Sequence, residues 1–143
     1  MKPLINSVTL NRSQEEVFDY LCDLKNELEW NPDMLIAEQL TEGPVGEGTR
    51  ILCQWKGGPK MVCTYTKFER PGYWEAFAAS KMMDIAFTCK VEPAEGGTRI
   101  TASLTLLPKG LLWLIGPLIR MSFQKEEEKN MDKLRKAVNN LGS

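Results

Sequence analysis

The stretch from Pro108 to Leu141 reads PKGLLWLIGPLIRMSFQKEEEKNMDKLRKAVNNL, and it decides how the rest of the chain is arranged. Its first part, residues 111–119, is almost wholly apolar, whereas the part that follows is strongly charged. In that second part apolar side chains recur at spacings of three and four residues: Met131, Leu134, Val138 and Leu141. This spacing is typical of a helix with one buried face. We therefore predict a long C-terminal helix that packs along one stripe.

Residues 4–106 contain one helical start signal among several segments with strand patterns. The sequence Ser13-Gln14-Glu15-Glu16 is a capping box, which predicts a helix that soon breaks into a second short one before Pro32. Alternating apolar and polar residues separated by Gly/Pro turns predict strands. The segments are 4–10, 34–40, 49–56, 61–68, 73–79, 83–91 and 98–106. Short turns between neighbours favour a strongly curved antiparallel meander, so the predicted class is α+β.

Composition limits the possible functions. The 143 residues suit one domain, 1–143, and a net charge of −1 gives no reason to expect nucleic-acid binding. The chain has no histidine, the commonest general base and transition-metal ligand, and none of its four cysteines form a CxxC pair. We therefore predict no metal and no cofactor.

The sequence also indicates the cellular compartment. The N-terminal residues show no signal-peptide pattern, and the apolar run at 110–119 is far shorter than the ~20 residues of a membrane-spanning helix. We expect a cytoplasmic protein with reduced, mostly buried thiols and no transmembrane segment. A homodimer is possible, but no feature indicates one.

Several local phrases occur in an order that resembles the SRPBCC superfamily, in its START-like, polyketide cyclase/dehydrase branch. They are Trp30-Asn31-Pro32, Glu47-Gly48-Thr49-Arg50, Phe68-Glu69-Arg70-Pro71, Gly96-Gly97-Thr98-Arg99-Ile100-Thr101, Pro108-Lys109-Gly110-Leu111-Leu112 and Gly116-Pro117-Leu118. The resemblance covers the whole chain and implies a helix-grip fold, in which a curved sheet of about seven strands holds the long C-terminal helix. It implies no catalytic residue that can be transferred, because the superfamily includes carriers, cyclases, ubiquinone-binding proteins and co-chaperones.

Large apolar side chains are the first candidates for a binding site. In a helix-grip fold they either line a cavity between sheet and helix or simply fill the core. Trp55 and Phe87 share the strand phase of apolar neighbours, whereas Trp74 lies on a strand that is apolar on both faces. The ligand-contacting set we predict is Trp30, Trp55, Trp74, Phe87, Leu104 and Trp113.

Polar residues on the buried stripe of the last helix are the second group of candidates. Projected back at about 100° per residue, the stripe passes Glu127, Gln124 and Arg120. A charge in a dry core is costly, so these residues either face a cavity and bind the polar end of a ligand, or form an internal ion pair. A third reading is that Pro117 shifts the helical phase and turns them toward water.

The apolar segment 111–119 is predicted to be a wall or gate of the cavity, with plain core and a membrane- or dimer-contacting surface as alternatives. The function that follows is binding of a hydrophobic or amphipathic small molecule such as a lipid, quinone or polyketide. One alternative is a cyclase/dehydrase-like enzyme that uses Glu127 as acid or base. Another is a protein-interaction module, co-chaperone-like or toxin-like, that uses segment 111–119.

Overall fold

Seven antiparallel strands form a single sheet in the order β1-β7-β6-β5-β4-β3-β2, in a computed structural model that describes residues 1–141. The strands are β1 (Leu4–Leu10), β2 (Met34–Gln39), β3 (Arg50–Trp55), β4 (Met61–Glu69), β5 (Tyr73–Ala79), β6 (Met83–Ala94) and β7 (Gly97–Pro108). From β2 to β7 each strand pairs with the next in sequence, and β1 pairs with β7 at the other edge. The predicted meander is confirmed.

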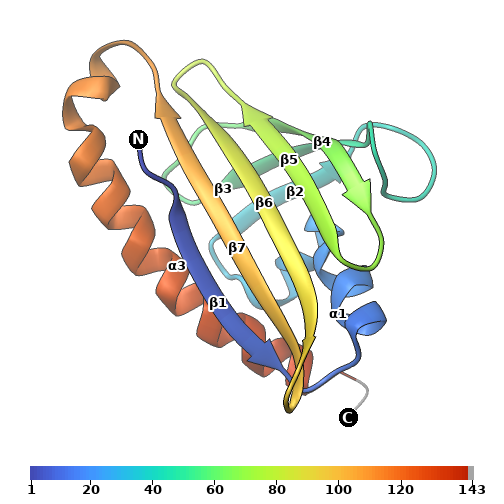
Figure 1. Cartoon of the computed structure of the whole chain (residues 1–143). Helices are drawn as coiled ribbons and strands as arrows, with labels where there is room; N and C mark the ends of the chain where they lie inside the picture. Colours follow the sequence, from blue (N-terminus) through green and yellow to red (C-terminus); the bar gives the residue numbers. More distant parts are fainter. Residues whose placement is uncertain (142–143) are drawn as a thin grey trace.

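Helices cover one face of this sheet. After β1 the chain forms α1 (Gln14–Leu21), the 3₁₀ turn η1 (Leu24–Asn26) and α2 (Glu27–Trp30). After β7 it forms the 3₁₀ segment η2 (Gly110–Ile115) and the long helix α3 (Gly116–Asn139). Figure 1 shows the curved sheet bending around α3, and α1 packs against β6 and β7. The α+β helix-grip architecture expected from the sequence is confirmed.

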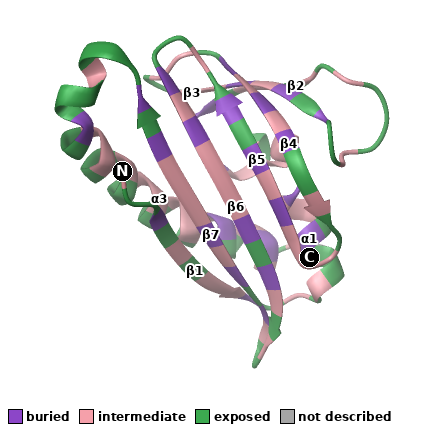
Figure 2. Ribbon diagram, turned by 45° about the horizontal axis from the view of Figure 1, so that its top comes forward, coloured by how far each residue is buried: buried purple, intermediate pink, exposed green. Residues whose placement is uncertain are grey.

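Buried side chains gather on the concave face in two clusters, and Figure 2 shows the alternation of buried and exposed positions along the strands. One cluster centres on β3, β4 and β5, and the other joins α1 and the C-terminal half of α3 to β6 and β7. A bulge between Tyr65 and Lys67 changes the phase of β4. Because of this bulge, both Tyr65 and Phe68 turn inward, although they are three positions apart in the strand.

Both ends of the helical layer are fixed by capping. The Ser13 hydroxyl accepts a hydrogen bond from the Glu16 amide at 3.3 Å, as the capping box predicts. The C-terminal end of α3 is held by Arg12, whose guanidinium donates to the carbonyls of Asn139 and Leu141. A cation at this end is stabilising because the last carbonyls of a helix lack partners and carry partial negative charge.

Pro117 does not disturb the helical phase. It lies in the first turn of α3, where proline fits because its missing N–H would have no partner within the helix. The helix therefore continues from Gly116 without a proline kink, and residues 110–115 form η2 instead of a further turn of α3. The alternative reading, in which Pro117 shifts the helical phase, is therefore wrong. No helix among residues 1–141 is long and apolar enough to cross a membrane.

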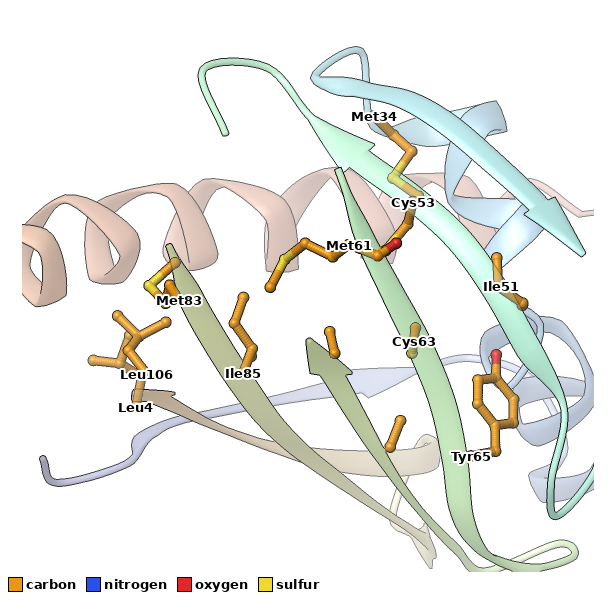
Figure 3. Close-up of a cluster of buried hydrophobic side chains, with 12 residues drawn as sticks. Leu4, Met34, Ile51, Cys53, Met61, Cys63, Tyr65, Met83, Ile85 and Leu106 are labelled. Carbon is orange, nitrogen blue, oxygen red and sulfur yellow. The ribbon is translucent and has the colours of Figure 1, made fainter. Parts of the chain in front are cut away.

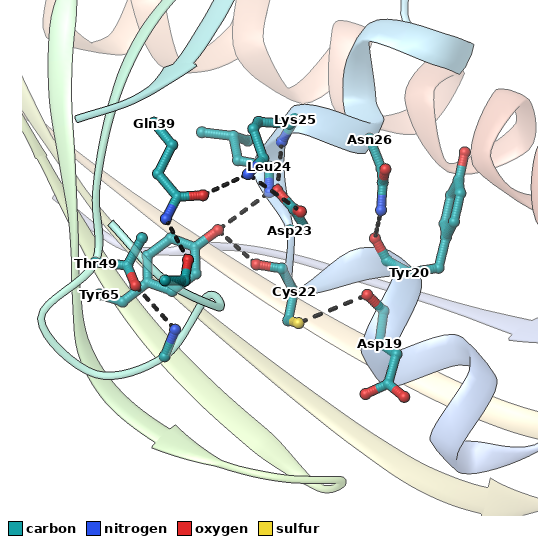
Figure 4. A network of polar contacts seen from close by, with 12 residues as sticks. Asp19, Tyr20, Cys22, Asp23, Leu24, Lys25, Asn26, Gln39, Thr49 and Tyr65 are labelled. Atoms are coloured by element: carbon teal, nitrogen blue, oxygen red, sulfur yellow. Dashed lines mark hydrogen bonds and ion pairs between the residues drawn. The ribbon is translucent and has the colours of Figure 1, made fainter. Parts of the chain in front are cut away.

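The Tyr65 hydroxyl ties the helical layer to the sheet, as Figure 4 shows. It donates to the Cys22 carbonyl and accepts from the Leu24 amide at 3.1 Å. Burial raises the pKa of this phenol, so it stays protonated and keeps donating. One side chain on β4 therefore fixes the path of the chain between α1 and η1.

We expect Tyr65→Phe to lower the free energy of unfolding by about 1–3 kcal/mol, because it leaves the Cys22 carbonyl and the Leu24 amide without this partner. Urea denaturation followed by circular dichroism measures the change. Tyr73→Phe is the control, since the Tyr73 hydroxyl donates to the side chain of Glu75, two residues along the same strand, at 2.6 Å. Equal stability of the two variants would contradict the role of Tyr65.

Candidate functional site

A cavity of about 860 Å³ lies between the concave face of the sheet, the α1–η1–α2 segment and α3. Its wall on the sheet side consists of side chains from β3 to β7, several of which Figure 3 shows projecting from the concave face. Exposed residues of two turns, Lys56 and Gly57 in one and Met82 in the other, also border it, so the cavity reaches the surface. Its wall is mostly apolar, as is common for sites that bind small organic molecules.

Six of the nine predicted ligand-contacting residues line this cavity: Trp30, Trp55, Trp74, Phe87, Leu104 and Glu127. Trp74 is buried and lies between two other rings, 5.2 Å from Phe18 and 6.3 Å from Phe87 between ring centroids. Trp55 and Phe87 are only half-buried. The rings therefore both build the core and border the empty space.

The other three predicted residues lie elsewhere. The Arg120 guanidinium donates to the carbonyls of Lys2 and Pro3, at 3.1 and 3.2 Å, on the β1 side of α3. Gln124 is exposed, and Trp113 in η2 is 58% exposed. Neighbouring residues of a helix point about 100° apart, so the stripe has two flanks. Ile119 and Phe123 occupy the flank that meets the cavity, whereas Arg120 occupies the flank that runs along β1.

Glu27, at the start of α2, forms the first half of a polar end of the cavity. Its Oε2 accepts hydrogen bonds from the Trp55 indole N–H and, at 3.0 Å, from the Asn31 amide. Asn31 is 2% exposed and is fixed in turn by the Asp33 N–H, which donates to its Oδ1 at 3.0 Å. Protein surrounds the Glu27 carboxyl although it borders the cavity, and this burial raises its pKa despite the two donors.

Glu127 on α3 forms the second half of the polar end of the cavity. Burial, together with the negative charge of Glu27, raises the pKa of Glu127 to about 7, while a hydrogen bond with Asn130 lowers it. The Asn130 Oδ1 is buried and has no hydrogen-bond partner among the described residues. All three side chains border the same cavity. Two carboxyls, one from α2 and one from α3, therefore border the same cavity, whereas the Asn130 Oδ1 is covered by protein.

Sequence reasoning missed Glu27, Asn31 and Asn130. The signal for Asn130 was present, because it lies three residues after Glu127 and four before Leu134, on the predicted stripe. The signal for Glu27 was weaker. Its spacing of four residues from Asn31 allows a helical contact, but the contact with Trp55 depends on how β3 meets α2.

The four cysteines are buried and free, as expected for inert thiols. Burial is the first cause that raises the pKa of each to about 12, so the reactive thiolate is scarce at neutral pH. Within residues 1–141, no three His, Cys, Asp or Glu side chains form a group that could hold a metal ion. The chemistry of the site therefore centres on its carboxyls.

The raised pKa of Glu127 predicts that stability falls as pH rises from about 4.5 to about 7. Over this range the unfolded chain loses the proton before the folded protein does, so ionisation favours unfolding. We expect Glu127→Gln to remove roughly 2 kcal/mol of this fall, after allowance for screening at the solvent-accessible cavity. Urea denaturation at pH 4.5, 6 and 8 measures it.

The exposed neighbour Glu128 gives a matched control, because Glu128→Gln makes the same change on the same helix. The variant Glu127→Gln should differ from it only in pH dependence. The other carboxyl and amino groups that border the cavity are Asp23, Glu27, Asp33, Lys56 and Glu126. Identical pH profiles for the two variants would show that Glu127 titrates as an exposed carboxyl.

Comparison with known proteins agrees with this geometry. Residues 5–139 match the family described as polyketide cyclase/dehydrase and lipid transport. Comparison with curated protein sequences gave no significant match.

Solved structures with the same fold include TTHA0849 from Thermus thermophilus, with 17% identity, 99% of each chain covered and a TM-score of 0.81. The protein XoxI from Bacillus cereus has 16% identity over 100% of this chain and 99% of its own, with a TM-score of 0.71. Ara h 8.0201 has 16% identity over 95% and 96%, with a TM-score of 0.68. The family match over residues 5–139 shows that the chain belongs to the polyketide cyclase/dehydrase and lipid transport family of the SRPBCC superfamily.

Proposed function

We propose that this protein binds a hydrophobic or amphipathic small molecule in the cavity between the curved sheet and α3. The observation that carries the proposal is the cavity itself, about 860 Å³ in volume and bordered by Trp30, Trp55 and Phe87. Its volume lies within the range of about 300–1,000 Å³ that is usual for small-molecule sites. The lipid transport named in the family description also supports a ligand of this kind.

The polarity of the wall defines what fits. Apolar side chains from the sheet and α3 contact the body of the ligand, and Glu27 and Glu127 offer polar groups for its other end. Such a division suits a molecule with a large apolar part and a single polar end. Burying the apolar part contributes about 25 cal/mol for each Å² removed from water.

Thermal unfolding in the presence of a compound panel tests the proposal. We expect at least one class among long-chain lipids, quinones and polyketide-like aromatics to raise the melting temperature and to change tryptophan fluorescence saturably. A ligand that binds only the folded state must raise apparent stability by mass action. If no compound produces either response, the cavity is not a binding site for these classes.

A second candidate is an enzyme of the cyclase/dehydrase type, and the Glu127–Glu27 pair favours it. A carboxyl with a pKa of about 7 both donates and accepts protons at neutral pH, as general acid–base catalysis requires. The cavity would fold a reactive chain by confinement while Glu127 moves the proton.

Turnover separates the two candidates. An enzyme should convert a poly-β-keto substrate, and Glu127→Gln should lower kcat by about 10²- to 10⁴-fold while the substrate still binds. Glu128→Gln should leave kcat unchanged. Binding without conversion by the wild-type protein would reject the catalytic candidate and leave the binding function standing.

A further inference from the structure

The charged groups that border the cavity are almost all acidic. The carboxyls are Asp23, Glu27, Asp33, Glu126 and Glu127. Among the described residues that border it, Lys56 is the one basic side chain, and it is exposed in the turn between β3 and β4. No buried cation among residues 1–141 therefore borders the cavity to neutralise a carboxylate or phosphate on a ligand.

Glu27 and Glu127 form a site of hydrogen-bond acceptors that the fold holds in position. Glu27 is oriented by the donors of Trp55 and Asn31, so its carboxyl keeps one position without a cationic partner in the described structure. Glu127 comes from another element, α3, and lies close enough for the charge of Glu27 to act on it. Both carboxyls supply acceptors at the cavity, so they fit a group that donates hydrogen bonds.

We propose that the ligand carries a protonated amine, which lies between Glu27 and Glu127 while its apolar tail contacts the aromatic wall. This rests on the proposed binding function and adds the chemical class of the ligand. An ammonium group offers three N–H donors and one positive charge, and charge-assisted bonds to carboxylates are roughly twice as strong as neutral ones. A ligand carboxylate would instead meet two acidic side chains at this end.

Three probes with the same tail and different head groups test the proposal: dodecylamine, dodecanol and dodecanoate. Calorimetric titration at pH 8, below micelle-forming concentrations, compares wild type with the double variant Glu27→Gln/Glu127→Gln. At this pH both the amine and the Glu127 carboxylate are charged. We expect the amine to bind most tightly, and the double variant to weaken it about 10- to 100-fold without changing dodecanol.

The experiment includes one control variant and one replacement for the double variant. Glu128→Gln removes one exposed charge and should leave all three affinities unchanged. Should the double variant unfold, Glu127→Gln alone keeps the Glu27 hydrogen bonds and still removes one carboxylate. Equal affinity for the three probes, or equal loss for all three, overturns the amine assignment while the binding function stands. Binding of none of them counts against the binding function itself.

A separate observation concerns the surface beside the cavity. Large apolar side chains are exposed around η2 and the first turns of α3, a surface that we call the η2 patch: Met82, Leu111, Trp113, Leu114, Ile115, Leu118 and Met121. The most exposed of them are Leu111 at 84% and Leu114 at 76%. An apolar surface of this extent usually marks an interaction site. The prediction that segment 111–119 forms a wall of the cavity is therefore only partly correct. Within this segment, Leu112 and Ile119 are the residues that border the cavity.

Basic groups surround the η2 patch. Lys109 precedes η2 and bonds through its N–H to the Met82 carbonyl, and Lys81 is next to Met82. On the other side Arg120 is bonded to the Lys2 carbonyl. Among the described residues, the acid in contact with these groups is Asp84, 3.0 Å from the Lys109 Nζ. An apolar centre with a basic rim matches the interface of an anionic membrane.

We infer that the η2 patch docks on the surface of an anionic lipid bilayer. Continuity with the cavity supports this occupant over a protein, since Met82 belongs to both the patch and the cavity wall, and the wall residues Leu112 and Ile119 are next to patch residues in the chain. A docked molecule therefore has its cavity entrance next to the acyl chains. The exposed Trp113 is of the residue type that prefers the membrane–water interface.

Co-sedimentation with phosphatidylcholine vesicles, with and without one quarter phosphatidylglycerol, tests this docking. Each basic residue near an anionic surface contributes about fivefold in affinity, so we expect clear binding only to the anionic vesicles and loss of it at high salt. Leu111→Ser/Leu114→Ser should abolish binding. The control is Leu35→Ser, an exposed leucine on β2 at the opposite edge of the sheet.

Three results would overturn the docking. The first is equal binding to both vesicle types, and the second is undiminished binding by the η2 patch variant. The third is a dimer of the wild-type protein that the same variant converts to a monomer, which would assign the patch to a second copy of the chain.

Discussion

Replacing Ala78 with phenylalanine is expected to abolish binding of hydrophobic ligands while the protein stays folded. Ala78 is buried on β5, faces the cavity and pairs across the sheet with Cys63 and Ile85. In a filled core the added ring would cost about 1–3 kcal/mol. Where the small side chain borders open space, the ring occupies that space instead. Stability should then stay the same or rise, and the room for a ligand is lost.

Two measurements on the same variants check this result: titration with the neutral dye N-phenyl-1-naphthylamine and denaturation by urea. Ala79→Phe is the matched control, since Ala79 is the exposed neighbour on the other face of β5. It should bind the dye like wild type. A strongly destabilised Ala78→Phe, or one that binds the dye with unchanged affinity, would show that this wall of the cavity is not the binding site.

Phe18→Ala should have the largest effect on stability, about 3–5 kcal/mol. The ring is fully buried and makes edge contacts with Phe68 and Trp74, both at 5.2 Å between centroids. Each such aromatic pair is worth about 0.5–1.5 kcal/mol beyond the buried area. The ring also joins α1 to the sheet, so its loss loosens the helical layer that closes the cavity.

The control for this variant is Phe77→Ala, the same change at an exposed ring on β5. It should cost less than about 1 kcal/mol. Urea denaturation of both variants gives the difference directly. A difference below about 1 kcal/mol between them would mean that the α1–sheet contact contributes little to folding.

The fold was predictable because its main signals are local. The capping box at Ser13, the alternation along β7 and the spacing of Leu134 and Val138 each follow from the period of one element. The turn at Gly96-Gly97 is also local. Gly97 has a positive φ, and a Cβ there would lie 2.1 Å from the Leu10 carbonyl oxygen, so only glycine fits beside β1.

The site was less predictable because it depends on contacts between elements. The periodicity of α3 placed Glu127 on the inner face, but it could not separate the flank toward the cavity from the flank toward β1. Arg120 therefore appeared as a ligand contact, although it binds the backbone before β1. Glu27 was missed for the same reason, since its indole donor comes from β3.

Segment 111–119 shows another limit of the sequence. Its uniform apolar character indicates a surface that avoids water, but it does not say what covers that surface. In the structure most of these side chains are exposed, and only the turn of the chain at η2 decides which two meet the cavity. Hydrophobic pattern alone thus cannot separate a core from an interface.

The four tryptophans report separately on the binding of a hydrophobic ligand inside the cavity. Trp30, Trp55 and Trp74 border the cavity, whereas Trp113 is exposed outside it. The direct test is an NMR titration of the assigned indole N–H signals with dodecylamine or the neutral dye. We expect saturable shifts at Trp55, Trp74 and Trp30 with Trp113 unchanged. Shifts confined to Trp113, or none at all, would contradict binding in the cavity.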